Sequence, residues 1–237
     1  MADDKIIKEF VKTYLKKDSP EVILLTGSRT FGINDSDVDL CVVNRDPKKY
    51  LRKYPSGFTA VEKYPKYFKG LEFEVEVVTW QHLNKYLKSF TTFHPFHYSN
   101  VKILLDKNGR YKKNIKKMPI KIRKAFIFDF FEDAYDDLNN AKKANWRKYG
   151  ATEKIHLHKA LDTSLNLLYL MNDQFIPAIK WKIFLLKTLK TIHKKFNEKY
   201  FTKLDIKKIE FIFGYLRVNL LKKNLITKKE LAVIFDQ

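Results

Sequence analysis

The stretch Leu24–Leu40, LLTGSRTFGINDSDVDL, joins a Gly-Ser turn to an Asp-x-Asp pair through one short loop. Residues 21–26 are largely apolar, which predicts a buried strand that ends at the turn. Gly27 permits a close or left-handed backbone, and Ser28 can cap a short helix that follows. Successive N–H groups at such a turn can bind phosphate oxygens, and Arg29 would add positive charge. The turn therefore predicts a phosphate site.

Residues 37–43 (DVDLCVV) predict the next strand, which carries two carboxylates on one face. Val38 and Leu40 would point into the core, whereas Asp37 and Asp39 would lie on the opposite face. Carboxylates at positions i and i+2 of a strand lie roughly 7 Å apart at the backbone, given a rise of ~3.3 Å per residue. Such a pair can bracket one divalent ion or two, and carboxylate oxygens favour hard cations. The pattern predicts Mg²⁺ at these two aspartates.

Two other interpretations of these acids compete with the magnesium site. Asp35, Asp37 and Asp39 resemble the start of an EF-hand calcium loop, but Leu40 would then occupy the sixth position, where that loop needs glycine. The second alternative is a turn whose acids are simply solvated. The Gly-Ser turn at the end of the preceding strand disfavours this alternative, because motif and context agree.

The Gly27-Ser28 turn, followed after eight residues by Asp37-x-Asp39, resembles the signature of the DNA-polymerase-β-like nucleotidyltransferases. The resemblance implies that the two aspartates are metal ligands and that the Gly-Ser turn binds the triphosphate. It also implies a third carboxylate on a later strand.

Residues 71–80 (LEFEVEVVTW) alternate as a strand would and offer three candidates for this third carboxylate. Glu72, Glu74 and Glu76 share the face opposite the apolar residues. Glu76 is the preferred candidate, because it lies deepest in the apolar stretch and its Val-Glu-Val context is similar to that of kanamycin-type aminoglycoside nucleotidyltransferases. A solvated strand face is the alternative for the other two.

The chain divides into two predicted domains, an α/β domain at 1–112 and a helical domain at 113–237. The fold class is therefore α/β (α+β), with a small mixed β-sheet nucleotidyltransferase domain followed by an all-α bundle of about five helices. In the first domain we expect an N-terminal helix, a helix at 80–90, a loop holding His94 and His97, and a strand from 101. In the second we expect helices at 120–147, 152–171, 203–223 and 228–235, and another that begins at Pro177.

Five acids concentrate within two turns of the first long helix: Asp129, Glu132, Asp133, Asp136 and Asp137. Like charges at helical spacings of three and four repel unless a cation or a proton lies between them. In kanamycin-type enzymes a helical carboxylate of the second domain acts as general base on the acceptor hydroxyl, and the resemblance places Asp136 nearest that role, with Glu132 and Asp133 as rivals. A solvated acidic face opposite a Phe126/Phe130 stripe is an equal alternative. An acidic pocket would also suit a cationic acceptor.

The net charge of +20 at first indicates a nucleic-acid partner. Because the lysines are spread through every predicted helix, the charge is only weak support for RNA or DNA binding. The single cysteine, Cys41, fits a reducing compartment, and its place in an apolar strand favours a buried structural thiol. The N-terminus does not resemble a signal peptide, and no apolar run approaches the ~18 residues of a membrane span. We expect a cytoplasmic protein.

These observations predict a Mg²⁺-dependent nucleotidyltransferase that acts from a cleft between the two domains. Asp37, Asp39 and Glu76 would hold two Mg²⁺ ions. The enzyme would transfer AMP from ATP, or another nucleoside monophosphate from its triphosphate, to a hydroxyl of an aminoglycoside-like small molecule and release pyrophosphate. The alternatives are transfer to an RNA such as a tRNA end, transfer to a protein, and a non-catalytic nucleotide-binding module. The protein would act as a monomer or a homodimer.

Overall fold

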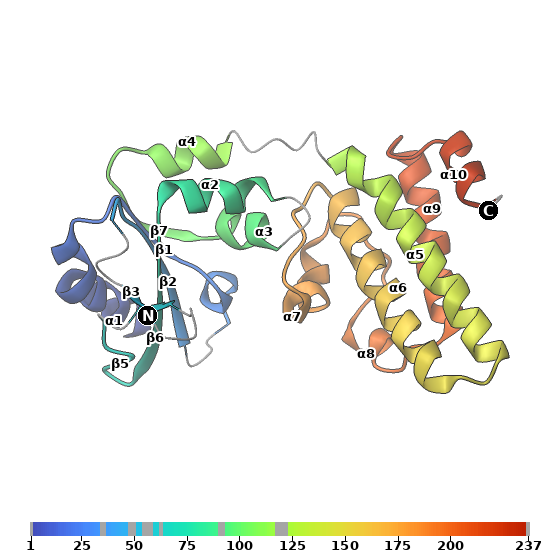
Figure 1. Ribbon diagram of the computed structural model, residues 1–237, viewed down its shortest axis with the longest axis horizontal. Coiled ribbons are helices and arrows are strands. Elements are labelled where there is room, and N and C mark those ends of the chain that lie inside the picture. The colour runs from blue at the N-terminus through green and yellow to red at the C-terminus, as the bar shows by residue number, and fades with distance from the viewer. Residues whose placement is uncertain are drawn as a thin grey trace. The chain divides into compact units, whose positions relative to one another are not determined.

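The computed structural model describes residues 2–33, 37–46, 51–53, 59–61, 64–89, 93–116 and 123–235. The chain forms two compact units (Figure 1). The first comprises Met1–Ser89 with His97–Met118, and the second comprises Phe90–Phe96 with Pro119–Gln237. Asp35, on which the EF-hand alternative depends, lies outside the described residues. Among the described residues, no helix combines the length and the hydropathy that crossing a membrane needs.

The first unit is built on a mixed sheet whose strand order is β5-β6-β2-β1-β7. Its strands are β1 (Val22–Leu25), β2 (Asp37–Val43), β5 (Tyr67–Phe68), β6 (Leu71–Val78) and β7 (Lys102–Asp106). Strands β2 and β6 pair in parallel, whereas β1 pairs antiparallel with both β2 and β7. Two further strands, β3 (Leu51–Lys53) and β4 (Thr59–Val61), form a separate ribbon. The fold class predicted from the sequence is confirmed.

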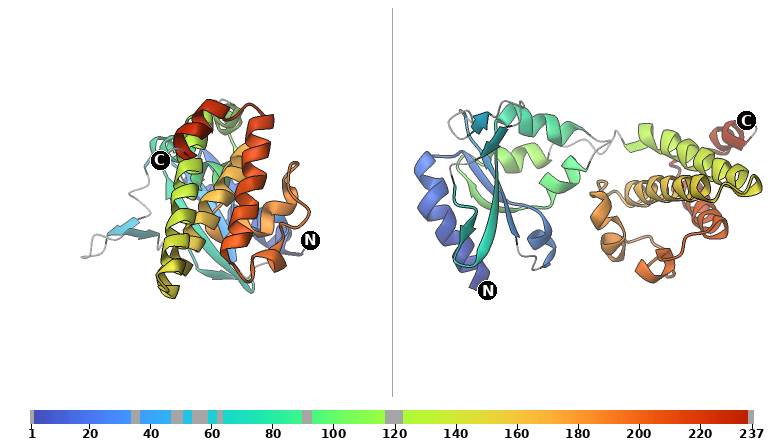
Figure 2. Two further views of the ribbon diagram at one scale, coloured as in Figure 1. Left: turned by 90° about the vertical axis from the view of Figure 1, so that its right-hand side faces the viewer. Right: turned by 60° about the horizontal axis from the view of Figure 1, so that its bottom comes forward.

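The N-terminal helix covers one face of this sheet (Figure 2). Helix α1 (Ala2–Phe10) continues as a π-helical turn, Val11–Leu15, and its apolar stripe meets the inward residues of β2 and β6. Phe10 is fully buried and stacks on Phe73 with ring centroids 3.8 Å apart. The same core contains Val38 and Leu40, as the alternation of β2 predicts. The two aspartates of β2 are thereby directed to the opposite face.

The opposite face carries α2 (Trp80–Lys88), the C-terminal part of α3 (His94–Ser99), which begins in the second unit, and α4 (Arg110–Lys116). Its core includes Cys41, Leu83, Tyr98 and Tyr111, all buried. The sequence prediction of a loop around His94 is wrong, because residues 94–99 form helix α3. Proline is tolerated in a first helical turn, and the segment also supplies a buried aromatic side chain to the core.

The second unit is helical. Its long elements are α5 (Arg123–Trp146), α6 (Gly150–Met171), α9 (Ile206–Lys222) and α10 (Lys228–Phe235); the shorter α7 (Ile179–Lys182), a 3-10 turn (Phe184–Thr188) and α8 (Glu198–Phe201) lie between α6 and α9. The four long helices confirm the predicted ones to within three residues at each described end. The helix expected at Pro177 begins only at Ile179 and is short.

In the first half of α5 the buried stripe differs by one position from the predicted Phe126/Phe130 stripe. Ile127 and Phe131 are fully buried, whereas Phe126 and Phe130 are only partly buried. Both pairs have helical spacing, so the sequence alone does not choose between them. Ile127 and Phe131 are the buried pair because the Phe131 ring packs against Phe213 of α9, with ring centroids 4.3 Å apart.

A buried asparagine organises the irregular segment between α6 and α9. The Asn172 amide donates to the carbonyls of Leu168 and Thr191, both at 2.8 Å, and its carbonyl accepts from the Thr191 N–H at 2.6 Å. Asn172 is 7% exposed, so water does not easily replace these partners. One side chain therefore ties the end of α6 to the segment that follows.

Replacement of this asparagine gives a first testable prediction. Asn172→Ala leaves the Thr191 backbone groups unpaired, so we expect the free energy of unfolding to fall by about 2 kcal/mol in chemical denaturation of the full chain. Asn140→Ala, on an exposed position of α5, is the matched control and should change stability little. Equal stabilities of the two variants would contradict a stabilising role for the Asn172 hydrogen bonds.

Candidate functional site

The register between β2 and β6 places acidic residues side by side. Asp39 lies opposite Glu74, and Cys41 lies opposite Glu76. Because neighbouring strands are about 4.8 Å apart and the paired residues share a face, the Glu74 carboxylate belongs to the same surface as that of Asp39. Sequence reasoning favoured Glu76 over Glu74, since only the strand register shows which glutamate adjoins the aspartate.

A cavity of about 260 Å³ opens over this pair of strands. It is lined by Thr26, Asp39, Leu40, Glu74, Val75, Glu76 and His97. The cavity thus brings together two of the predicted site residues, Asp39 and Glu76. His97, which was not assigned a role from the sequence, adds an imidazole to the same cavity. Asp37 is half-buried at the first position of β2 and is not among the lining residues of this cavity.

Gly27 packs directly on the Asp39 side chain. The Thr26 N–H donates to the Asp39 carbonyl at 2.9 Å, which holds the end of β1 against β2. Gly27 follows with φ +71° and ψ −157°, a conformation that is accessible essentially to glycine alone. A Cβ at this position would lie 1.8 Å from Asp39 Oδ2. The carboxylate position therefore depends on the absence of a side chain at Gly27.

The turn after Gly27 is a 3-10 helix, Ser28–Phe31. The Thr30 N–H and hydroxyl both bond to the Gly27 carbonyl, at 3.2 and 2.7 Å. Ser28 is 4% exposed, so it lies within the turn. The predicted Gly-Ser turn is thus a defined, hydrogen-bonded structure beside Asp39. Its role in binding phosphate stays a prediction.

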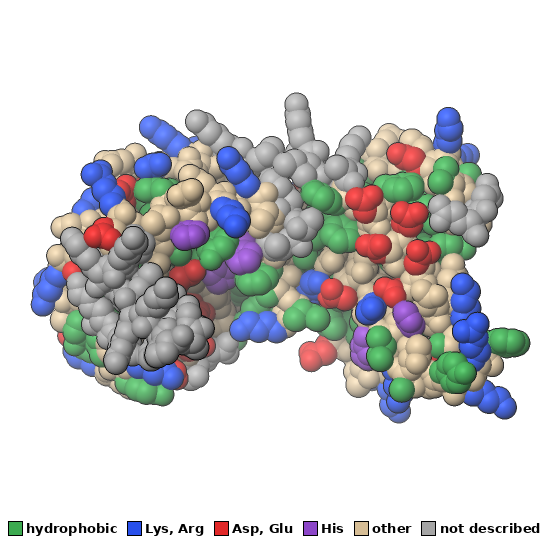
Figure 3. Space-filling view, viewed as in Figure 1, with side chains coloured by type: hydrophobic (Ala, Val, Ile, Leu, Met, Phe, Trp, Pro, Cys, Tyr) green, Lys and Arg blue, Asp and Glu red, His purple; other side chains and the backbone are tan. Residues whose placement is uncertain are grey.

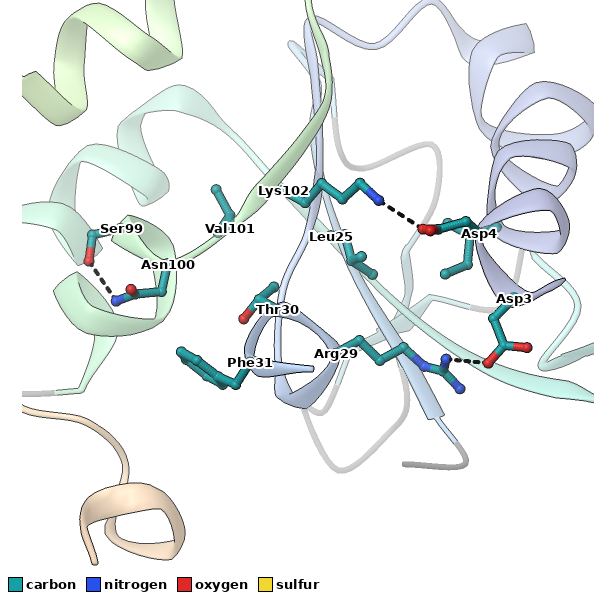
Figure 4. A pocket seen from close by; sticks show the side chains of 11 residues that line it. Asp3, Asp4, Leu25, Arg29, Thr30, Phe31, Ser99, Asn100, Val101 and Lys102 are labelled. Atoms are coloured by element: carbon teal, nitrogen blue, oxygen red, sulfur yellow. Dashed lines mark hydrogen bonds and ion pairs between the residues drawn. The ribbon is translucent and has the colours of Figure 1, made fainter. Parts of the chain in front are cut away.

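Arg29 links three elements of the first unit, and Figure 4 shows its contact with Asp3 of α1. Its Nε donates to the Asp37 carbonyl at 2.7 Å, and its Nη1 forms an ion pair with Asp3 of α1 at 2.7 Å. The side chain is 7% exposed. This guanidinium therefore holds the first residue of β2 in place. A contact with a nucleotide phosphate, which the sequence suggested, stays a prediction.

A second cavity of the first unit, about 660 Å³, lies beside this arginine (Figure 4). It is lined by Asp3, Asp4, Ile7, Leu25, Arg29, Thr30, Phe31, Ser99, Asn100, Val101 and Lys102. Lys102 pairs with Asp4 at 2.8 Å, and this hydrogen bond lowers the pKa of the Asp4 carboxyl below its usual value. Two ion pairs from the first turn of α1 thus form one wall of the cavity.

Glu76 is oriented by a buried tyrosine. The Tyr98 hydroxyl donates to Glu76 Oε2 at 2.6 Å, and the Tyr98 ring stacks on Tyr86. The Tyr111 hydroxyl in turn donates to the Tyr98 carbonyl. Burial raises the pKa of Tyr98 far above its ordinary value, so the phenol keeps its proton and remains a donor. One oxygen of Glu76 is therefore engaged.

The donor chemistry of this site fits a nucleotide-bound magnesium ion. Within the described ranges, no three His, Cys, Asp or Glu side chains are arranged to hold a metal by themselves. Mg²⁺ is usually bound through one or two carboxylates together with substrate phosphates and water, rather than by a cage of protein ligands. Asp37 and Asp39 beside a Gly-Ser turn match that mode of binding.

The acidic cluster of the second unit borders a cavity of about 650 Å³. Its lining residues are Asp133, Asp136, Asp137, His158, Lys159, Asp162, Thr163 and Ile179. Figure 3 shows acidic side chains gathered on the face of this unit that α5 and α6 present. Asp137 is paired with His156 at 2.8 Å, and Asp162 with the buried Lys182 at 2.6 Å. Asp136, the predicted general base, is exposed.

Repulsion within the cluster acts on Asp133. Burial, followed by the charges of Asp137, Asp129 and Asp136, raises the pKa of Asp133 above its usual 3.8. A carboxyl with a raised pKa is more easily neutralised by a proton or a cation. The cluster therefore favours positively charged neighbours.

Comparison with known proteins supports the fold. A solved structure of a nucleotidyltransferase-like protein from Exiguobacterium sibiricum 255-15 is similar to this chain, with a TM-score of 0.50 and 16% sequence identity. The similarity covers 96% of this chain and 79% of that protein. No protein-family model matches the sequence, and the curated proteins give no match. At this identity the likeness shows a nucleotidyltransferase-like fold.

The packing of Gly27 on Asp39 gives the second prediction. Gly27→Ala should lower the free energy of unfolding by roughly 3 kcal/mol, because the new methyl group meets a carboxylate and the backbone conformation is unfavourable for alanine. Gly32 also has a positive φ, +75°, but a Cβ there would meet nothing within 4 Å. Gly32→Ala is therefore the control, with an expected loss of about 1 kcal/mol. If both variants lose the same free energy of unfolding, the contact between residue 27 and Asp39 does not affect stability.

The raised pKa of Asp133 gives the third prediction. The folded protein binds the proton of the Asp133 carboxyl more tightly than the unfolded chain does. The ionised carboxylate therefore lowers the stability of the folded protein at neutral pH. This loss disappears as the pH falls through the raised pKa to below 3.8. We expect Asp133→Asn to have a higher melting temperature than the parent protein at pH 7 and the same one at about pH 3. A lower melting temperature at pH 7 would contradict this account.

Proposed function

We propose that this protein is a nucleotidyltransferase that transfers a nucleoside monophosphate, AMP from ATP, to a hydroxyl group of an acceptor. The observation that carries the proposal is the packing of the Gly27 turn on Asp39, beside Glu74 and Glu76 of the neighbouring strand. A turn suited to phosphate and a group of carboxylates suited to a hard cation thus occupy one surface of a nucleotidyltransferase-like fold.

In this proposal Asp37, Asp39 and Glu76 hold Mg²⁺, and two ions are expected. The metal would neutralise charge on the triphosphate when it is bound. Tyr98 keeps the Glu76 carboxylate in one orientation through its 2.6 Å hydrogen bond, and Arg29 fixes the Asp37 backbone. These two side chains act as positioning residues.

The Gly27 and Ser28 turn binds the triphosphate in this proposal, with charge added by Arg29. The acceptor oxygen attacks the α-phosphorus, a new P–O bond forms, and the bond to pyrophosphate breaks. The proton of the acceptor hydroxyl passes to a carboxylate, for which Asp136 is the proposed general base.

A small cationic molecule, aminoglycoside-like in its charge and hydroxyl groups, is the proposed acceptor. The cavity of the helical unit that contains Asp133 and Asp136 supports this choice, because a cationic ligand relieves the mutual repulsion of the acids. An RNA end, a protein hydroxyl and a non-catalytic nucleotide-binding role are the alternatives that the assay below separates.

The test uses the full-length protein with labelled ATP, Mg²⁺ and three acceptor panels: aminoglycosides, tRNA and proteins. We expect pyrophosphate release and acceptor labelling with aminoglycosides, and a loss of roughly 100-fold or more in Asp39→Asn with unchanged thermal unfolding. Glu72→Gln, on the same face of the neighbouring strand β6, is the control; Glu72 pairs with Lys66 at 2.8 Å, so its replacement should leave turnover unchanged. Substantial activity in Asp39→Asn would overturn the site assignment, and labelling confined to tRNA or protein would overturn the acceptor.

A further inference from the structure

The turn between α5 and α6 displays two exposed aromatic side chains among basic residues. Trp146 is 82% exposed and Tyr149 is 60% exposed. The exposed fraction of Trp146 is the highest among the large hydrophobic residues that the structure describes. We define residues 142–155 as the α5–α6 tip. It contains five basic side chains and one acid, Glu153.

The charges of the α5–α6 tip are largely uncompensated. Lys142 pairs with Glu210 of α9 at 2.7 Å. The other basic side chains form no ion pair within the described part of the chain; they are Lys143, Arg147, Lys148 and Lys154. Glu153 accepts a hydrogen bond from Asn145 at 3.0 Å. The tip is therefore strongly positive, as Figure 3 illustrates where Lys and Arg side chains gather at the α5–α6 end of the helical unit.

The backbone of the tip is held in a defined conformation. The Tyr149 N–H bonds to the Ala144 carbonyl and the Lys148 N–H to the Asn145 carbonyl, both at 2.9 Å. These are the two bonds of a Schellman motif, with Lys148 in the left-handed position at φ +60°. The aromatic rings thus project from an ordered turn, which limits the conformational entropy that a ligand would have to remove.

We propose that the α5–α6 tip binds single-stranded RNA. Unstacked bases stack on exposed Trp and Tyr rings, while Lys and Arg side chains contact the backbone phosphates. Single-stranded loops and ends of RNA present such bases, whereas the stacked bases of a duplex are closed to the rings. An anionic membrane fits less well, because the tip exposes only three large apolar side chains, Trp146, Tyr149 and Ile155, which is little apolar area to insert into a bilayer.

The α5–α6 tip shares no residue with the proposed catalytic site, and binding to it is measured without turnover. The full-length protein is titrated into a short oligouridylate that carries a fluorescent dye, and the fluorescence anisotropy of the dye reports the complex for the parent protein and every variant; quenching of tryptophan fluorescence is a second readout for the parent protein. The other two tryptophans are better shielded: Trp80 is 9% exposed and Trp181 is half-buried. We expect quenching and a dissociation constant that rises steeply with salt.

Three variants test the tip, and each is expected to fold. Trp146→Ala should weaken RNA binding about 10-fold, whereas Trp146→Phe should keep most of the affinity and lose the quenching of tryptophan fluorescence. Lys148→Gly removes a charge and also relieves a left-handed backbone, so it should be at least as stable as the parent protein. It should reduce the slope of log affinity against log salt by ~0.7.

Tyr67→Ala is the matched control. Tyr67 is 65% exposed and lies beside Lys66 and Lys69, but both lysines are paired with glutamates, at 2.8 and 2.5 Å. This variant should bind RNA as the parent protein does. Equal RNA affinity of Trp146→Ala and the parent would overturn the proposal, as would equal losses for duplex and single-stranded RNA, or binding of anionic vesicles but not of the oligouridylate.

Discussion

The contact between Gly27 and the Asp39 carboxylate is the constraint on which the first unit depends. It joins the end of β1, the start of the 3-10 turn and the acidic strand β2 at one point. Because the carboxylate occupies the space of a missing Cβ, neither the turn nor the strand can shift alone. The Arg29 guanidinium adds a second link, from the turn to the Asp37 carbonyl. The groups that we propose for phosphate and metal binding are therefore held in place by backbone geometry.

Most of the fold could be predicted from periodicity, because its core strands and helices are regular. The strand at 37–43 and the four long helices follow directly from their apolar spacing. The sequence was insufficient where two patterns fit equally. In α5 the choice of Phe131 over Phe130 is made by Phe213, 82 positions later along the chain (213 − 131), and local spacing cannot contain that information. Helix α3 was missed because a six-residue segment with an early proline carries little periodicity.

The residues of the motif in the candidate site could be identified from the sequence, but the residues that lie beside them in the folded protein could not. Gly27 and Asp39 could be chosen from residue type and spacing, since the chemistry of a turn and an acidic strand is local. The position of Glu74 beside Asp39 depends on strand register, and the pairing of Asp137 with His156 depends on how α5 meets α6. Interactions of this kind arise only after folding, so they add residues to the site that no short motif contains.

The burial of Cys41 has a practical consequence. It is the only cysteine of the chain, it lies opposite Glu76 inside the sheet, and burial raises the pKa of its thiol well above the ordinary value. A protonated, enclosed thiol reacts slowly with alkylating reagents. A cysteine introduced on the surface of each unit would then be labelled selectively on a native background. Distances between such labels would show how the two units are arranged in solution, and whether nucleotide changes that arrangement.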